Sequence, residues 1–153
     1  MEFEIKRKNY PGGTVFNAYS PKRERVATIN VSLRPEEGHA FIEMIKSHTV
    51  GLEGGRALHT LYKHVEAWAR EKKMKRIRTN AYVYVTPFFE KRGYTYVIPK
   101  DQRTVIGSRE EWRKKLAKAP PGESPKAFWK RSRELQHRFQ LIFKMQKRLT
   151  AKP

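Results

Sequence analysis

The chain has 153 residues, with 34 lysines and arginines against 15 aspartates and glutamates, and no cysteine. This length is enough for one domain with a hydrophobic core, and the lack of cysteine excludes disulfides, thiolate catalysis and cysteine-ligated zinc. A net charge of +19 is more than a solvated surface needs, so it indicates a polyanionic partner, either nucleic acid or a ribonucleoprotein. The alternative is a basic protein without such a partner.

No run of apolar residues reaches the length of a membrane span, and the N-terminal residues MEFEIKRKNY are typical of a strand rather than a signal peptide. We therefore expect a soluble, cytoplasmic protein. His59 and His64 are five residues apart on a predicted helix, which places them on different faces, and the five histidines form no tight cluster. We therefore predict no metal site.

The first 50 residues alternate between apolar and polar side chains, as strands do. Phe3 and Ile5, for example, fall on one face of the first predicted strand. The four predicted strands are MEFEIKR, TVFNAYS, RVATINVSL and HAFIEMIKSHTV, separated by PGG, SPKRE and RPEEG turns. Because these turns are short, we predict a meander of antiparallel strands.

The apolar period changes to that of an amphipathic helix from Gly55 to about Lys73. RIRTNAYVYV then predicts a strand, TPFFEKRG a short helix with Pro87 in its first turn and Gly93 at its C′ position, and YTYVI another strand. Strands joined by a helical crossover run parallel, so the sheet should be mixed. The predicted fold class is α+β, with a mixed, mainly antiparallel sheet and flanking helices.

Residues 100–153 carry 16 basic and 5 acidic residues and are the more basic part of the chain. We therefore divide the chain into a domain of residues 1–99 and a basic helical extension of residues 100–153, which packs on that domain or on a partner. Trp112 and Trp129 lie among the cations and suit stacking on bases. The candidate nucleic-acid contacts are Arg113, Lys114, Lys130, Arg131, Arg133, Lys144, Lys147 and Arg148.

The extension is predicted to contain two helices. Ser108 and Glu111 have capping-box spacing, which predicts the start of a short helix. After an APPGESP linker, Ser124 and Pro125 predict the start of a long helix that continues to about Leu149. Its apolar stripe would consist of Phe128, Leu135, Phe139, Ile142, Met145 and Leu149.

Two segments after the four predicted strands are similar to segments of a known family. They are, in chain order, GGRALHTLYKHVEAWAREKKMKRIRTN and TPFFEKRGYTYV. The first segment resembles the main cofactor segment of the GNAT superfamily of N-acyltransferases, and the second is similar to that family's second segment; together the resemblance covers residues 40–97. It implies that acetyl-coenzyme A pairs with the edge of the fourth strand and rests its pyrophosphate on the following turn and helix. The implied cofactor contacts are Ser47, Thr49, Val50, Gly51, Gly54, Gly55, Arg56, Ala57, Asn80 and Phe89.

Two residues depart from the coenzyme A turn of that family. The first position of the turn is a basic or amide residue in the family and is Val50 here. The central position is a glycine in the family and is Glu53 here. Glutamate adopts a positive φ less readily than glycine, and a carboxylate about 4 Å from a phosphate would be repelled by roughly 4 kcal/mol at an effective dielectric near 20. Glu53 either turns to solvent or acts as the helix's own N-terminal anion. Arg56 would partly replace the lost positive charge.

Acyl transfer to an amine needs a base for the amine proton and often an acid for the departing thiolate. The resemblance implies a tyrosine acid in the short helix, but that position is Phe89, so Tyr84 is the nearest substitute. Glu43 on the fourth strand is the family-like base, and His48 is the second candidate because imidazole titrates near neutral pH. The alternatives are a packing role for Tyr84 and a surface ion pair for Glu43.

Only KNYPGGT separates the first two strands, where the family has one or two helices, so the acceptor side should be open or closed by the C-terminal helices. Three hypotheses follow. The first is an acetyltransferase that acts on an amine of a nucleic-acid-associated substrate. The second is a catalytically degenerate GNAT-fold protein that binds nucleic acid or a ribonucleoprotein, and the third is a base-modifying enzyme that uses another donor.

Overall fold

The computed structural model describes residues 2–48, 52–138 and 141–149. The chain divides into two compact units, of which the first comprises Met1–Thr79 with Lys147–Pro153 and the second comprises Asn80–Gln146. Two strands, β5 (Arg76–Tyr82) and β7 (Ile142–Arg148), pass from one unit to the other. We describe each unit by itself.

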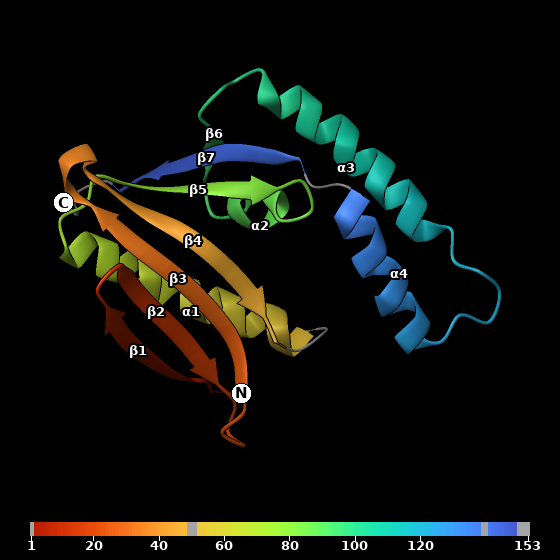
Figure 1. Ribbon diagram of the computed structural model, residues 1–153, viewed down its shortest axis with the longest axis horizontal. Coiled ribbons are helices and arrows are strands. Elements are labelled where there is room, and N and C mark those ends of the chain that lie inside the picture. Colours follow the sequence, from red (N-terminus) through yellow and green to blue (C-terminus); the bar gives the residue numbers. More distant parts are fainter. Residues whose placement is uncertain (1, 49–51, 139–140, 150–153) are drawn as a thin grey trace. The chain divides into compact units, whose positions relative to one another are not determined.

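Four antiparallel strands open the first unit, as predicted (Figure 1). They are β1 (Glu4–Tyr10), β2 (Gly13–Tyr19), β3 (Arg25–Arg34) and β4 (His39–Ser47), with a 3₁₀ turn, η1 (Pro35–Glu37), before the last. Glycine is required at the start of β2, because a Cβ on Gly13 would lie 2.5 Å from the carbonyl oxygen of Val31 on β3. A larger residue there would push the β1–β2 hairpin away from β3.

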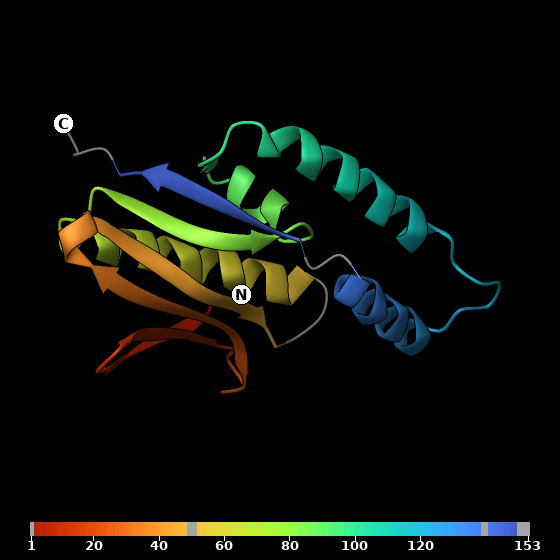
Figure 2. The same ribbon diagram turned by 45° about the horizontal axis from the view of Figure 1, so that its top comes forward.

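One helix, α1 (Leu52–Glu71), covers one face of β2, β3 and β4 (Figures 1 and 2). Trp68 of α1 packs edge-on against Phe16 of β2, with 5.4 Å between ring centroids. The helix begins three residues before Gly55, so the predicted start is wrong. The apolar period could not locate this end, because the first turn contains a glutamate and two glycines that carry no such period. The fully buried members of its apolar stripe are Ala57, Leu61, Val65 and Ala69.

The sheet continues beyond β4 in the hydrogen-bonded order β1-β2-β3-β4-β5-β7-β6. β4 and β5 are parallel, as the α1 crossover predicts. β7 runs antiparallel to β5: in the first unit Leu149 N–H donates to the carbonyl of Lys75 at 2.8 Å, and in the second Val83 N–H donates to that of Leu141 at 3.2 Å. The predicted fold class, α+β with a mixed and mainly antiparallel sheet, is therefore confirmed.

The second unit contains α2 (Thr86–Glu90), β6 (Thr95–Tyr96), α3 (Asp101–Ala117) and α4 (Pro125–Arg138). A small core of Val83, Val105 of α3 and Phe143 of β7 lies in this unit, with Tyr96 of β6 packed against it. Pro87 lies in the first turn of α2, as predicted. Gly93 has a φ of +90°; because Lys91 is the C-cap, Gly93 lies one position beyond the predicted C′.

The two long helices differ in how well their starts were predicted. Ser124 caps α4, since its Oγ accepts a hydrogen bond from Ala127 N–H at 3.1 Å. Ser108 caps nothing and lies inside α3, which begins at Asp101; the capping-box spacing also fits a helix interior, so that prediction is wrong. None of the helices in the described ranges is both long and apolar enough to cross a membrane.

The predicted continuation of α4 to Leu149 is also wrong, because the chain leaves the helix at Arg138 and forms β7. The apolar residues here fit two periods at once. Helical spacing joins Ile142 to Met145, whereas strand alternation joins Phe143 to Met145. Phe143 and Met145 are 7% and 0% exposed, whereas Ile142 is 54% exposed. The strand period prevails because β7 completes the sheet between β5 and β6.

We expect Phe143→Ala to lower the free energy of unfolding by about 3 kcal/mol or more, because it removes a buried ring. Ile142→Ala should lower it by less than about 1 kcal/mol, because that side chain is largely exposed. Urea unfolding followed by circular dichroism measures both. A larger loss for Ile142→Ala than for Phe143→Ala would favour the continuous helix.

Candidate functional site

The pairing of β4 changes in its middle. The register between β3 and β4 shifts after Asn30, so that Glu43 is an extra residue on β4, a β-bulge. The parallel ladder to β5 stops at Ile42. Within the described part of the chain, Glu43 to Lys46 therefore have no ladder partner on β5. This edge offers backbone N–H and C=O groups to an extended molecule that contains amides.

The N-terminal turn of α1 follows β4 in the chain. Its first N–H groups have no intrahelical partner, so such a turn attracts anions. Gly54 and Ala57 are buried, whereas Gly55 and Arg56 are exposed. A Cβ on Gly55 would meet no described atom from outside its own helical turn within 4 Å, so the space beside it is open. Three predicted cofactor contacts, Thr49, Val50 and Gly51, lie outside the described residues.

The structure removes one of the two objections to Glu53. Because Glu53 lies within the helical backbone of α1, no positive φ is needed there, and the argument for glycine at this position is wrong. The electrostatic objection depends on the direction of the Glu53 side chain, which lies outside what is described. Ser47, the last residue of β4, is half-buried.

His48 is held by a chain of hydrogen bonds. Its Nε2 lies 2.8 Å from Thr28 Oγ1, and the Thr28 hydroxyl donates to Asn17 Oδ1 at 2.6 Å. Because that hydroxyl has one proton, Nε2–H of His48 must be the donor, which leaves Nδ1 as a proton acceptor. Burial, together with the charges of Arg25 and Lys46, lowers the pKa of His48. The imidazole is therefore neutral at pH 7 and can act as a base.

Glu43, the other predicted base, is an exposed surface charge. Its Oε1 accepts a hydrogen bond from Ser32 Oγ at 2.8 Å and lies 3.5 Å from Arg34 Nη2. This is the surface ion pair that the sequence left open as the alternative, and its partner is Arg34. Of the two candidates, His48 has the better geometry for a base, because its ring is oriented by partners and keeps one nitrogen for a proton.

Tyr84, in the second unit, is half-buried and stacks on Tyr82 with 5.6 Å between ring centroids and 5° between planes. The ring centroid of Trp112, on α3, lies 6.4 Å from that of Tyr84. Burial raises the pKa of Tyr84, and the neighbouring Tyr82 adds to the effect. The phenol is therefore protonated at neutral pH, as a proton donor must be.

Two predicted cofactor contacts in the second unit differ in accessibility. Asn80 is exposed on β5. Phe89 is 1% exposed and packs against Tyr94, with 4.9 Å between ring centroids. A contact from Phe89 to a bound cofactor is therefore not supported by its position, because packing already uses the whole ring.

A half-buried polar cluster in the second unit was not predicted from any motif. Arg109 Nη1 donates to Glu90 Oε1 at 2.6 Å, and the Tyr96 hydroxyl donates to the other oxygen of Glu90. Burial and the bond to Glu90 raise the pKa of Tyr96. The cluster joins α2, β6 and α3, whose residues are too distant in sequence for a motif to connect them. We assign it a structural role.

Most candidate nucleic-acid contacts are exposed, but two are engaged. Arg131 donates to both carboxylate oxygens of Glu123, at 2.8 and 2.9 Å. Lys147 forms an ion pair with Glu66 at 3.0 Å. Since these two cations already have acidic partners, they are less available to phosphates. The exposed members are Arg113, Lys114, Lys130, Arg133, Lys144 and Arg148.

No protein-family model and no curated protein matches the chain, but solved structures do. A protein from Klebsiella pneumoniae assigned as an acyl-CoA N-acyltransferase has 15% identity and a TM-score of 0.56, over 97% of this chain and 98% of that one. A GNAT-family acetyltransferase from Staphylococcus aureus has 16% identity and a TM-score of 0.50, over 59% and 58%. N-acetylglutamate synthase from Neisseria gonorrhoeae, solved with coenzyme A and N-acetyl-glutamate, has 12% identity and a TM-score of 0.51, over 90% and 26%.

At these identities the likeness concerns the fold, and the chain has the GNAT fold. The resemblance that two segments of the sequence indicated is thus confirmed at the level of architecture. It also extends further than the sequence suggested. The match over 97% of the chain reaches beyond residue 97 into the basic extension, where β7 takes its place in the sheet.

The lowered pKa of His48 predicts how stability depends on pH. Since the unfolded chain binds the proton more tightly, the free energy of unfolding should fall as pH falls from about 6.5 to 5. His48→Gln should make this decrease in the free energy of unfolding smaller. Part of the decrease should remain in the variant, because the pKa of buried His39 is also lowered. Urea unfolding at pH 7 and pH 5 measures the change. An NMR titration that places the His48 pKa above 6.5 would contradict the assignment.

Proposed function

We propose that this protein is an N-acetyltransferase that uses acetyl-coenzyme A to acetylate an amine of a nucleic-acid-associated substrate. The observation that carries the proposal is the succession of an unpaired β4 edge and the N-terminal turn of α1. The edge presents amide groups, and the turn presents N–H groups beside an exposed Gly55 and Arg56. These are the two features that a pantetheine chain and a diphosphate need from a protein.

The residues of the α1 turn fit the proposed cofactor in charge and space. Arg56 provides a cation, and no described atom lies within 4 Å of a Cβ on Gly55. Buried Gly54 and Ala57 keep the turn close to the body of the first unit. Glu53 opposes the diphosphate only if its carboxylate faces it, and then by roughly 4 kcal/mol.

Acetyl-coenzyme A, when bound, supplies the acyl carbon as a thioester. The amine nitrogen bonds to this carbon, the carbon–sulfur bond breaks, and the amine loses a proton. His48 Nδ1 accepts that proton, since Thr28 holds the ring by its other nitrogen. The departing thiolate takes up a proton in turn. Tyr84 of the second unit stays the acid that the sequence predicts, and its raised pKa keeps the phenol protonated at neutral pH.

The charge of the chain supports an acceptor associated with nucleic acid. The whole chain carries +19, and α3 and α4 present exposed cations beside two partly exposed tryptophans. Cations bind phosphates, and indole rings stack on bases. A second candidate function is binding without catalysis, which the buried Phe89 favours, because the family's tyrosine acid is missing at that position.

Calorimetry with acetyl-coenzyme A tests the proposal. We expect the wild-type chain to bind, and Gly55→Trp to weaken binding at least about tenfold because the indole fills the space beside the turn. Gly107→Trp is the matched control, since Gly107 is also an exposed helical glycine with no atom within 4 Å of its Cβ. If the wild type fails to bind and Glu53→Gly binds, the protein is a degenerate GNAT-fold module.

Binding to a short RNA across a range of salt concentrations tests the acceptor class. We expect affinity to fall steeply with salt, and Lys130→Gln combined with Arg133→Gln to reduce the slope by about 2, because each substitution removes one cation that neutralises a phosphate. Arg131→Gln should change the slope less, because Glu123 already neutralises that guanidinium. No binding of RNA or duplex DNA at low salt would contradict the nucleic-acid association.

A further inference from the structure

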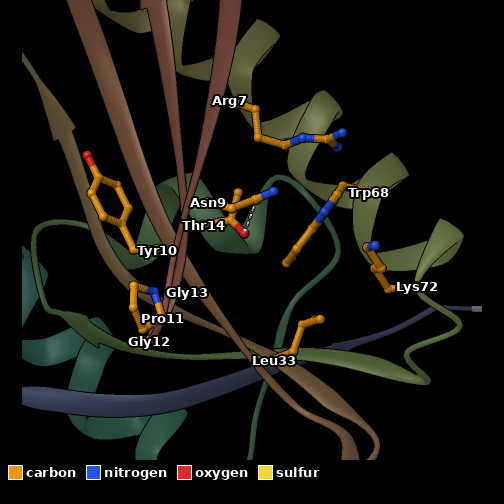
Figure 3. Close-up of a pocket in the computed structure, with 10 residues that line it drawn as sticks. All are labelled: Arg7, Asn9, Tyr10, Pro11, Gly12, Gly13, Thr14, Leu33, Trp68 and Lys72. Carbon is orange, nitrogen blue, oxygen red and sulfur yellow. Dashed lines mark hydrogen bonds between the residues drawn. The ribbon is translucent and has the colours of Figure 1, made fainter.

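A cavity of about 340 Å³ opens in the first unit between the β1–β2 hairpin and the C-terminal part of α1 (Figure 3). The residues that matter for its chemistry are Arg7, Asn9, Thr14, Leu33, Trp68 and Lys72. It is separate from the proposed donor site, because Trp68 follows Leu52 by 16 positions along α1, which is about 24 Å of helix.

Two cations face this cavity without acidic partners. Arg7 reaches from β1 toward α1, and Lys72 follows the last turn of α1 (Figure 3). Neither belongs to an ion pair with any residue in the described ranges. None of the described residues that line the cavity is acidic. The field inside it is therefore positive and suits a ligand with more than one negative charge.

Hydrogen-bonding groups and apolar surface complete the lining. Thr14 Oγ1 donates to Asn9 Oδ1 at 3.0 Å, which leaves the Asn9 amide N–H groups free to donate (Figure 3). Trp68 and Leu33 form an apolar wall. A second cavity of about 360 Å³ shares Arg7 and Trp68 with the first and is also lined by Phe16, His64 and Glu71. Because the Glu71 carboxylate would repel an anion, the charged group of a ligand belongs in the first cavity.

We propose that this cavity binds a small phosphate ester, such as a nucleoside monophosphate. The phosphate lies between Arg7 and Lys72 and accepts hydrogen bonds from Asn9. Guanidinium and ammonium groups bind phosphate oxygens through strong charge-assisted hydrogen bonds. The remainder of the ligand lies along Trp68. The site is independent of the proposed acetyl transfer, because it shares no residue with the β4 edge or the α1 N-terminal turn.

A ¹⁵N NMR titration of the full chain with inorganic phosphate, and then with adenosine monophosphate, tests the proposal. We expect saturable shifts in the amides of residues 7–14 and 64–72, weaker in 0.5 M salt. Arg7→Gln and Lys72→Gln should each weaken binding at least about fivefold. Lys8→Gln and Lys63→Gln remove the same charge from the same strand and helix. Neither lysine lines either cavity or has an ion pair in the described ranges, so these substitutions should change affinity less than about twofold.

Three outcomes would overturn the proposal. Equal weakening by Lys8→Gln or Lys63→Gln would mean that phosphate responds to the net charge alone. No saturable shift with either phosphate would mean that no small-ligand site exists. Shifts seen only with an oligonucleotide would assign the surface to nucleic acid instead. Gly55→Trp should leave the phosphate titration unchanged, so a failure of the donor-site proposal can be told apart from a failure here.

Discussion

The burial of α1 against β2, β3 and β4 is the constraint on which the rest of the structure depends. Trp68 meets Phe16 near one end of the helix, and Leu61 and Val65 are fully buried along its middle. Each large apolar side chain contributes about 2 kcal/mol when removed from water. Because only residues 48–51 lie between β4 and α1, this packing holds the N-terminal turn of the helix close to the end of β4. The same packing leaves the cavity of about 340 Å³ open between the C-terminal end of α1 and the β1–β2 hairpin.

Electrostatics hold the last strand to the first unit. Glu66 on α1 accepts hydrogen bonds from Arg70 at 2.9 Å and from Lys147 of β7 at 3.0 and 3.2 Å. Burial alone would raise the pKa of Glu66, but these two cations outweigh it and lower the pKa. The ion pair therefore stabilises the fold above the ordinary pKa of a glutamate and is lost as pH falls below it. It also explains why one cation of the basic extension serves structure rather than binding.

The candidate site was predictable where its residues are neighbours in sequence. Gly54 to Ala57 follow β4 closely, so a strand-to-helix junction could be inferred from the two periods alone. The support for His48 was not predictable, because Thr28 and Asn17 come from β3 and β2 and meet it only through the antiparallel register. The same register gave Glu43 a partner in Arg34, which made it a poorer base than its position suggested.

The sequence by itself determined the four-stranded meander, the amphipathic α1 and the parallel pairing of β4 with β5, because each follows from a local period and a short connection. Only the tertiary structure decided the C-terminal segment. Met145 fits both a helical stripe with Ile142 and a strand alternation with Phe143. The local sequence pattern therefore does not distinguish a helix from a strand here, whereas the burial of Phe143 and Met145 shows the strand. The segment forms a strand because it lies between β5 and β6 in the sheet. The backbone N–H and C=O groups along those two strands need hydrogen-bond partners, which another strand provides and a helix does not.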